Sequence, residues 1–164
     1  MQTSRLFENK VRSLSGLKNT IARLKAGGKR IVFTNGCFDI LHYGHIQYLQ
    51  EAAKKGDILI VAVNSDSSVR RIKGKKRPII KEAERLRTVA ALESVDYAVL
   101  FKEDTPLKLI KSLKPDVLVK GADWKKGDIV GGDIVTACGG RVSTIKVTKG
   151  RSTSNLIKKI AKRF

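Results

Sequence analysis

Short apolar runs alternate along the chain with stretches in which apolar and polar residues recur at helical spacing. The apolar runs predict strands at residues 31–34, 58–63, 97–101, 117–119 and 142–147. The helical spacing predicts helices at residues 44–55, 66–72, 81–94, 106–113, 128–137 and 153–163. Strands that alternate with helices are typical of a parallel sheet with right-handed crossovers. The pattern therefore predicts an α/β fold, a doubly wound parallel sheet of about five strands with helices on both faces.

The apolar run at residues 58–63 is nearly continuous, as expected for a strand that is covered on both faces. Residues 73–80 interrupt the pattern and are predicted to form a basic loop. Residues 1–28 are predicted to form an N-terminal helical extension outside the core, and residues 29–164 the α/β domain itself. Because such sheets bind ligands at the carboxyl ends of their strands, beside a topological switch point, the site is expected there.

The composition is that of a globular protein with one domain. The chain has 164 residues, of which 41% are hydrophobic and 30% are charged. No run approaches the roughly 18 apolar residues of a membrane span, and the first residues lack the apolar core of a secretory signal. Cys37 and Cys138 are isolated, so neither a zinc ribbon nor a disulfide framework is indicated. A cytoplasmic protein without membrane contact is expected.

The net charge changes the picture, because 34 Lys and Arg residues against 15 Asp and Glu residues give +19. A charge of this size raises the hypothesis of a nucleic-acid-binding protein. The cations are nevertheless spread along the chain, and only residues 70–77 form a dense cluster. That cluster contains no aromatic side chain on which bases could stack. Nucleic acid is therefore not expected as the main ligand, although a basic protein on a nucleotide-binding fold stays an alternative.

The stretch from Thr34 to His45 carries the most specific chemistry, because it joins a predicted strand to the start of a predicted helix. Backbone N–H groups at a helix start favour anions, and the missing side chain of Gly44 allows a ligand to come close. His42 and His45 are three residues apart, so both imidazoles can face the same oxygens. The stretch predicts a phosphate site, with the protonation state of the histidines open.

Two other interpretations of the histidines stay open at this point. They could be surface residues that fell together by chance, or they could bind a metal together with Cys37. The chain has only two histidines, and both lie in this stretch, which speaks against chance. No fourth ligand of suitable spacing accompanies the three residues, which speaks against zinc.

A second stretch, Gly150-Arg151-Ser152-Thr153-Ser154, also leads from a glycine through hydroxyl residues into a predicted helix. Ser152 or Thr153 is the candidate N-cap, with free N–H groups behind it. Taken alone, this is a common way to begin a helix. Beside the histidine stretch, it is expected to form the second wall of a phosphate pocket.

These stretches resemble the nucleotidyltransferase superfamily that is marked by a His-x-Gly-His signature, here residues 42–45. Its Rossmann-like members join a nucleoside triphosphate to a phosphorylated small molecule and release pyrophosphate. Their Gly-x-Phe-Asp element matches residues 36–39, and their Gly-x-Ser-Thr-[Ser/Thr] element, which binds the outer phosphates, matches residues 150–154. The chain departs from the cytidylyltransferase branch at Cys37, where that branch usually has Thr, and at Val147, where it has Arg.

The resemblance implies catalytic roles for His42, His45 and Lys73. It implies nucleotide contacts from Asn35, Gly36, Cys37, Phe38, Gly44, Lys120, Gly121, Ser152, Thr153 and Ser154. It implies contacts with the second substrate from Asp39, Asp66, Arg71, Arg85 and Asp123. Mg²⁺ is expected to arrive with ATP, held by the triphosphate rather than by protein side chains.

Longer stretches over roughly residues 30–160 resemble the bacterial heptose 1-phosphate adenylyltransferases. They include Ala91-Leu92-Glu93-Ser94-Val95-Asp96 and the run from Pro115 to Asp123. This resemblance implies transfer of AMP from ATP to D-glycero-β-D-manno-heptose 1-phosphate, for lipopolysaccharide or another glycan. A sister cytidylyltransferase acting on glycerol 3-phosphate is the nearest alternative. A homodimer is usual among relatives, and the length leaves no room for a fused sugar kinase, so the stand-alone form is expected.

Overall fold

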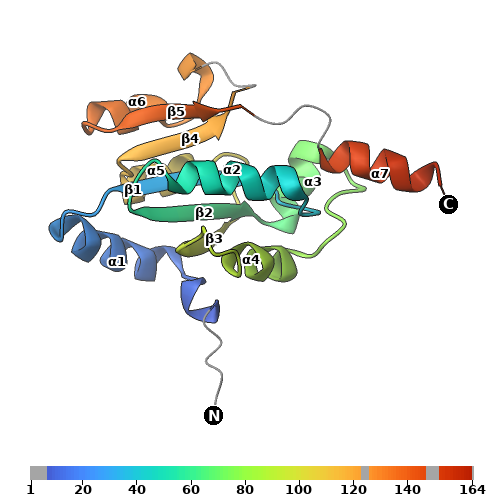
Figure 1. The fold of residues 1–164 in the computed structure, drawn as a ribbon, viewed down its shortest axis with the longest axis horizontal. Helices are drawn as coiled ribbons and strands as arrows, with labels where there is room; N and C mark the ends of the chain where they lie inside the picture. Colours follow the sequence, from blue (N-terminus) through green and yellow to red (C-terminus); the bar gives the residue numbers. More distant parts are fainter. Residues whose placement is uncertain (1–6, 123–125, 147–151, 164) are drawn as a thin grey trace, which may run out of the picture.

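In a computed structural model of the chain, the described residues are 7–122, 126–146 and 152–163. Within them, five strands form one sheet in the order β3-β2-β1-β4-β5, and every neighbouring pair is parallel (Figure 1). The strands are β1 (Ile31–Gly36), β2 (Ile58–Asn64), β3 (Tyr97–Phe101), β4 (Val117–Gly121) and β5 (Arg141–Ile145). The predicted fold class, a doubly wound Rossmann-like sheet, is confirmed.

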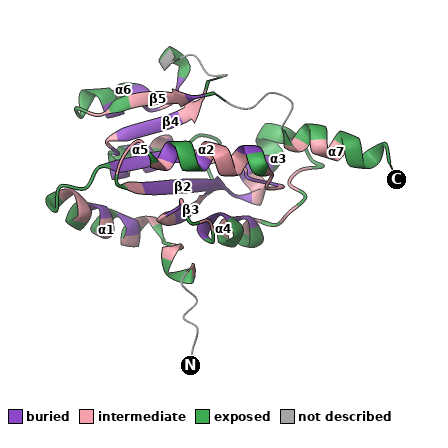
Figure 2. Cartoon of the chain, viewed as in Figure 1, coloured by how far each residue is buried: buried purple, intermediate pink, exposed green. Residues whose placement is uncertain are grey.

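Helices cover both faces of the sheet because alternate strand residues point to opposite sides. Ile31 and Phe33 belong to one core cluster, whereas Val32 between them belongs to the other. The first cluster is completed by α1 (Leu14–Ala26), α5 (Leu107–Leu113) and α6 (Gly132–Ala137). The second is completed by α2 (Tyr43–Ala53) and α4 (Glu82–Ala90). Figure 2 shows the result, a buried sheet between helices with exposed outer surfaces.

The remaining elements connect or extend this layered body. Helix α3 (Asp66–Lys73) directly follows β2, and α7 (Thr153–Ala161) is the last helix of the described chain. Two short 3-10 turns, η1 (Glu8–Lys10) and η2 (Lys126–Asp128), precede α1 and α6. No helix in residues 7–122, 126–146 and 152–163 has the length and apolar character needed to cross a membrane.

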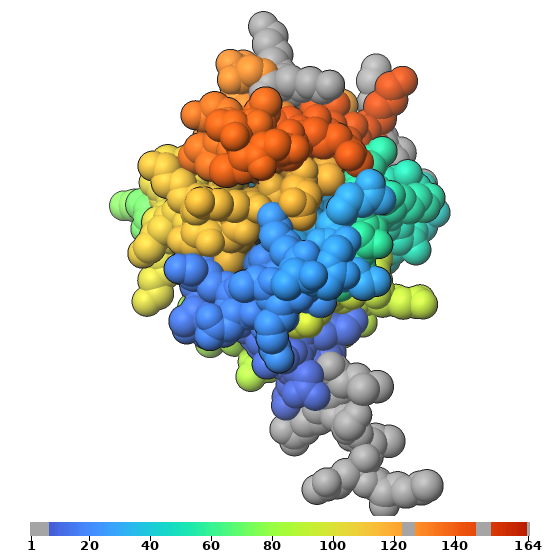
Figure 3. Space-filling model, turned by 90° about the vertical axis from the view of Figure 1, so that its left-hand side faces the viewer, coloured from blue at the N-terminus to red at the C-terminus, as the bar shows by residue number. Residues whose placement is uncertain are grey.

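Helix α1 corrects the expectation that residues 1–28 lie outside the core. Leu17 and Ile21 of this helix are buried in the same cluster as the strand residues. Helix α1 contacts α5, and α5 contacts α6, so the three helices lie side by side over one face (Figure 3). The leading segment is therefore part of the packed domain, and even before this helix Val11 pairs with Ala98 of β3 and packs against the second cluster.

Some predicted boundaries were wrong for local reasons. The helix predicted at 128–137 begins only at Gly132, because Gly131 takes a left-handed conformation with φ of 82°. The helix predicted at 81–94 ends at Ala90, and the helix predicted at 106–113 begins at Leu107, with Pro106 as its N-cap. Ser152 is confirmed as the N-cap of α7.

The amino ends of the strands are closed by aspartates. Asp57 accepts a hydrogen bond from Arg30 N at 2.8 Å. Asp116 accepts one from Ile31 N, and Asp96 one from Leu59 N, both at 2.7 Å. These carboxylates satisfy N–H groups that the first residues of the strands would otherwise leave without partners. At the opposite edge, where the carboxyl ends of the strands lie, β1 stands at the switch point between β2 and β4.

Candidate functional site

A cavity of about 620 Å³ opens at the carboxyl ends of the strands, around the end of β1. Most of the residues predicted for the site line it: Asn35, Gly36, Cys37, Phe38, Asp39, His42, Gly44, His45, Lys73, Lys120, Gly121, Ser152, Thr153 and Ser154. The cavity is therefore the place at which the two predicted stretches meet. We call Gly36–His45 the histidine wall and Ser152–Ser154 the hydroxyl wall.

The histidine wall begins with a tight turn that needs its glycine. A Cβ atom on Gly36 would lie 3.1 Å from the ring of Phe38. Phe38 itself has a φ of 48°, an unusual left-handed conformation for a residue with a side chain, and it is only 5% exposed. Burial of this ring thus holds the backbone in a shape that turns the chain from β1 toward α2.

The two imidazoles lie against each other at the start of α2. His42 is the N-cap residue, and its backbone N–H donates to His45 Nδ1 at 3.4 Å. The rings are stacked with their centroids 3.9 Å apart. Because Nδ1 of His45 accepts a hydrogen bond, the proton of the neutral ring belongs on Nε2. His45 therefore has one N–H donor left for a ligand in the cavity.

Burial lowers the pKa of His45 to about 4, and the neighbouring His42 adds to the effect. A group with this pKa is neutral at pH 7, so His45 acts as a neutral hydrogen-bond donor and not as a cation. The positive charge of the cavity comes instead from Lys73 and Lys120, whereas that of Arg77, which also lines it, is paired with Asp39. Lys120 Nζ also donates to Asn35 Oδ1, which holds both side chains at the end of β1 and β4.

Helix α2 is held in place under the histidines by a buried polar contact. Thr34, which is fully buried, lies 2.8 Å from the hydroxyl of Tyr48 and donates to Val119 O at 3.0 Å. The contact joins α2 to β1 and β4 at once, so the helix start cannot shift independently of the sheet.

The hydroxyl wall reaches the same cavity from the far end of the chain. Ser152 caps α7 by accepting a hydrogen bond from Asn155 N at 3.1 Å. Thr153 Oγ1 donates to Ile40 O at 3.4 Å, across 113 residues of sequence. Ser152–Ser154 and both imidazoles thus line the same cavity, and the N-terminal end of α7 favours an anion there.

Asp39 lines the cavity, but its carboxylate is occupied by protein groups. It accepts hydrogen bonds from Ile79 N and Ile80 N at 2.8 Å and from Arg77 Nε at 2.5 Å. Burial alone would raise the pKa of Asp39, but these hydrogen bonds outweigh it and lower the pKa. The predicted substrate contact of Asp39 is therefore corrected: its side chain, with no exposed surface, ties the histidine wall to the loop after Lys73.

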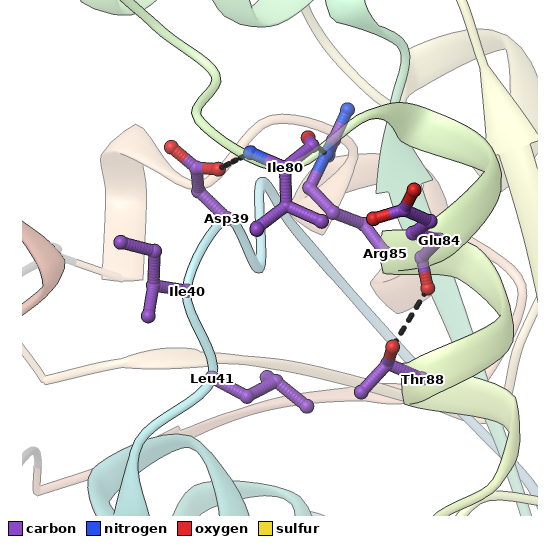
Figure 4. A pocket seen from close by; sticks show the side chains of 7 residues that line it. All are labelled: Asp39, Ile40, Leu41, Ile80, Glu84, Arg85 and Thr88. Carbon is purple, nitrogen blue, oxygen red and sulfur yellow. Dashed lines mark hydrogen bonds between the residues drawn. The ribbon is translucent and has the colours of Figure 1, made fainter.

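Arg85 is corrected in the same way. Its side chain is fully buried, and it donates to Ile80 O, Cys37 O and Asp66 Oδ1. Figure 4 shows Asp39 and Arg85 on either side of Ile80, beside a smaller cavity of about 280 Å³. A guanidinium without exposed surface cannot contact a substrate phosphate, so Arg85 is a positioning residue.

The other described residues that were predicted to contact the second substrate do not line the main cavity. Asp66 is paired with Arg85 at 2.8 Å, and neither residue lines the cavity. Arg71 does not line it either, because it donates to Asp104 Oδ1 and to Lys102 O, both at 2.6 Å. Contacts of Asp66 and Arg71 with a substrate stay predictions. Asp123 lies outside the described residues.

Sequence reasoning missed several residues that line the cavity: Tyr48, Asn64, Ile72, Arg77, Asp104, Thr105, Pro106, Ile129 and Val130. Asn64 and Thr105 follow the predicted strands 58–63 and 97–101, so the rule for strand ends could have found them. Tyr48 lies one turn inside a predicted helix and carried no signal of its own.

The geometry defines a class of protein: α/β proteins that bind a polyanion at the topological switch point of a parallel sheet. The family model described as cytidylyltransferase-like matches residues 33–159 of the chain. The chain therefore belongs to the cytidylyltransferase-like family, and it is a nucleotidyltransferase.

Individual relatives agree with this assignment. Over 155 residues the chain is 55% identical to the bifunctional protein HldE of Geobacter metallireducens, an alignment that covers 94% of this chain and 32% of that protein. The chain thus spans about a third of the length of the curated relatives it matches. The crystal structure of a lipopolysaccharide core biosynthesis protein from Thermoplasma volcanium is 36% identical with a TM-score of 0.62, covering 76% of this chain and 100% of that one.

A more distant structure shares the fold alone. The pantoate-β-alanine ligase of Francisella tularensis, in complex with β-γ ATP and β-alanine, is 14% identical with a TM-score of 0.62. The alignment covers 88% of this chain and 68% of that chain. The predicted membership of the nucleotidyltransferase superfamily is confirmed, whereas the role of each site residue stays a prediction.

Proposed function

We propose that the chain is an adenylyltransferase that transfers AMP from ATP to D-glycero-β-D-manno-heptose 1-phosphate, forming ADP-heptose and pyrophosphate. The observation that carries the proposal is the meeting of the histidine wall and the hydroxyl wall around one cationic cavity. The 55% identity to a protein named HldE supports the choice of substrates within the family. The name of the Thermoplasma volcanium protein supports a place in lipopolysaccharide or other glycan synthesis.

The reaction needs positioning and charge stabilisation more than covalent help. An oxygen of the heptose phosphate attacks the α-phosphorus of ATP, and the bond from that phosphorus to the bridging oxygen breaks. Pyrophosphate leaves with the electron pair. The attacking oxygen is already anionic, so no general base is required.

The protein groups divide this work between them. His42 and His45 donate hydrogen bonds to the phosphate oxygens where negative charge increases, with His45 using its Nε2–H. The hydroxyl wall and the α7 start hold the outer phosphates of ATP. Lys73 and Lys120 supply the positive charge that attracts the two polyanions, because Arg77 is already paired with Asp39.

Mg²⁺ belongs to this proposal as an ion carried by ATP. The two carboxylates that line the cavity, Asp39 and Asp104, are each paired with an arginine. Among the described residues no group of three or more His, Cys, Asp and Glu side chains could hold a metal. The triphosphate oxygens are therefore the fitting ligands, and when bound the ion offsets charge on the leaving pyrophosphate.

The decisive experiment measures pyrophosphate release with ATP or CTP, each combined with heptose 1-phosphate or glycerol 3-phosphate. The proposal expects the fastest release with ATP and heptose 1-phosphate. Fastest release with CTP and glycerol 3-phosphate would support the sister cytidylyltransferase instead. No release from any pair, together with salt-sensitive DNA binding, would support the nucleic-acid alternative.

A homodimer and a cytoplasmic location stay predictions. Helix α7 supports the first, because it has no buried residue and its apolar Ile160 is 49% exposed. Such a short amphipathic helix gains most of its stability from packing, and a second subunit would supply a surface for it. Sedimentation of the purified protein measures the subunit number directly.

A further inference from the structure

Asn64 ends strand β2 and is a polar residue that the proposed mechanism does not use. It lines the main cavity, yet it is only 2% exposed. A buried amide of this kind is costly unless its groups are hydrogen-bonded. The partners of its two polar atoms therefore decide what it can recognise.

The hydrogen bonds around Asn64 determine the direction in which its amide points. The carbonyl of Glu103 can only accept, so Ser68 must donate its single hydroxyl proton there, at 2.8 Å. Ser68 Oγ is then left as an acceptor for Asn64, and the amide must present Nδ2 to it, at 2.9 Å. Asn64 Oδ1 is consequently open to a ligand as an acceptor, since no hydrogen bond among the described residues reaches it, and the second N–H of Nδ2 remains beside it as a donor.

An oxygen in this position selects a particular ligand chemistry. Oδ1 accepts hydrogen bonds and cannot donate, and the oxygens of an ionised phosphate also only accept. Asn64 Oδ1 therefore cannot form a hydrogen bond with such a phosphate, but it can accept one from a hydroxyl group. The locked amide makes the choice strict, because a flip would lose the bond to Ser68.

The position in the cavity indicates which substrate provides the hydroxyl. Lys120 and Gly121, for which nucleotide contacts are predicted, lie at the end of β4, on one side of β1. Asn64 lies on the β2 side, together with Lys73 and Thr105. We infer that Asn64 is a specificity-determining residue, whose Oδ1 accepts a hydrogen bond from a sugar hydroxyl of the acceptor; this inference rests on the proposed function.

The test compares acceptors that differ by one hydroxyl group. For the wild-type enzyme, kcat/KM should be about tenfold lower with one single-deoxy analogue than with heptose 1-phosphate, because that analogue lacks the hydroxyl that donates to Oδ1. Asn64→Ala should raise the KM for heptose 1-phosphate about tenfold and abolish the discrimination against that analogue. The KM for ATP should not change. A merely structural role would slow every acceptor equally and leave the discrimination intact.

Two further variants separate the amide from its support. Ser68→Ala removes the group that orients Asn64 without touching the cavity, and should raise the acceptor KM by a smaller factor, about threefold. Ser67→Ala, a neighbouring hydroxyl that pairs with Ser65 outside the cavity, is the matched control and should behave as wild type.

Each outcome supports or overturns a defined statement. The role of Asn64 would be overturned if Asn64→Ala kept the wild-type KM for heptose 1-phosphate or still discriminated against the analogue. Turnover by wild type in the same assay would nevertheless support the proposed function. No pyrophosphate release by wild type with any sugar 1-phosphate would overturn the proposed function, and the inference with it.

Discussion

The histidine wall and the hydroxyl wall of the cavity are attached to the molecule in different ways. The histidine wall continues a central strand, and its Phe38 and Asp39 are almost completely buried. The hydroxyl wall begins a helix that has no buried residue among those described, and a long hydrogen bond of 3.4 Å, from Thr153 Oγ1 to Ile40 O, joins it to the first wall. The first wall is preorganised by the fold, whereas the second depends on weak contacts and on the ligand itself.

The largest effect is expected where the histidine wall holds the loop that follows Lys73. Asp39→Ala leaves Arg77 and two backbone N–H groups without their acceptor. The free energy of unfolding should fall by about 3 kcal/mol, as for a broken buried ion pair. Urea unfolding measures it. Asp104→Ala is the matched control, because it breaks a half-exposed arginine pair and should cost less than about 1 kcal/mol. Equal losses in both variants would show that Asp39 is no anchor.

His45→Ala should affect the rate and leave the fold intact. It removes one donor to the charge that develops on phosphate, so kcat should fall by roughly 100-fold or more. Pyrophosphate release measures the rate, and circular dichroism checks the fold. Gln50→Ala, on the exposed side of the same helix, should keep the wild-type rate. A near-native rate in His45→Ala would remove this imidazole from the mechanism.

The depressed pKa of His45 makes the histidine wall sensitive to acid. His45 binds a proton below pH 6.5 in the unfolded chain, but in the folded protein its pKa is about 4, so it binds the proton only near that pH. Stability should therefore decrease between these two pH values, by roughly 2 kcal/mol at pH 5 relative to pH 7.

Urea unfolding at both pH values tests this, with His45→Gln as the comparison. The variant should lose less stability on acidification, because glutamine does not titrate. The imidazole ¹⁵N shifts give the pKa directly, since the chain has only two histidines. An ordinary pKa near 6.5 for His45 would contradict the prediction.

The smallest effect is expected at the hydroxyl wall. Ser152→Ala removes the cap of α7, which typically costs about 1 kcal/mol of helix stability. Because α7 buries no residue, the cost should be local: faster hydrogen exchange in α7 and a higher KM for ATP, with an unchanged unfolding midpoint. A lower unfolding midpoint in Ser152→Ala would mean that the two walls unfold together and do not differ in local stability.

The same difference explains what the sequence could and could not predict. Continuous apolar runs such as residues 58–63 identify buried strands, and parallel topology then brings their carboxyl ends together. The meeting of residues 42–45 and 152–154 followed from that rule. The strand positions and the residues lining the cavity were therefore largely predictable.

The direction and burial of the charged side chains could not be predicted from the sequence. Asp39 and Arg85 occur in motifs that suggest contact with a substrate, but the motif does not reveal that Ile80 lies between them. The start of α6 depended on Gly131, whose Cβ would lie 2.7 Å from Ile110. Both features depend on contacts between residues far apart in the chain, which spacing along it cannot encode.

The placement of Ile80 between a carboxylate and a guanidinium has a consequence for how this site can change over time. The backbone of Ile80 donates its N–H to Asp39 and offers its carbonyl oxygen to Arg85, so the direction of the chain at this residue dictates which neighbour must accept and which must donate. Exchanging the two charges would preserve the net charge but would set Arg against an N–H and Asp against a carbonyl. A double replacement that exchanges the two side chains, which rescues many direct ion pairs, is not expected to rescue this arrangement, because Asp39 and Arg85 are paired with Arg77 and Asp66 and not with each other.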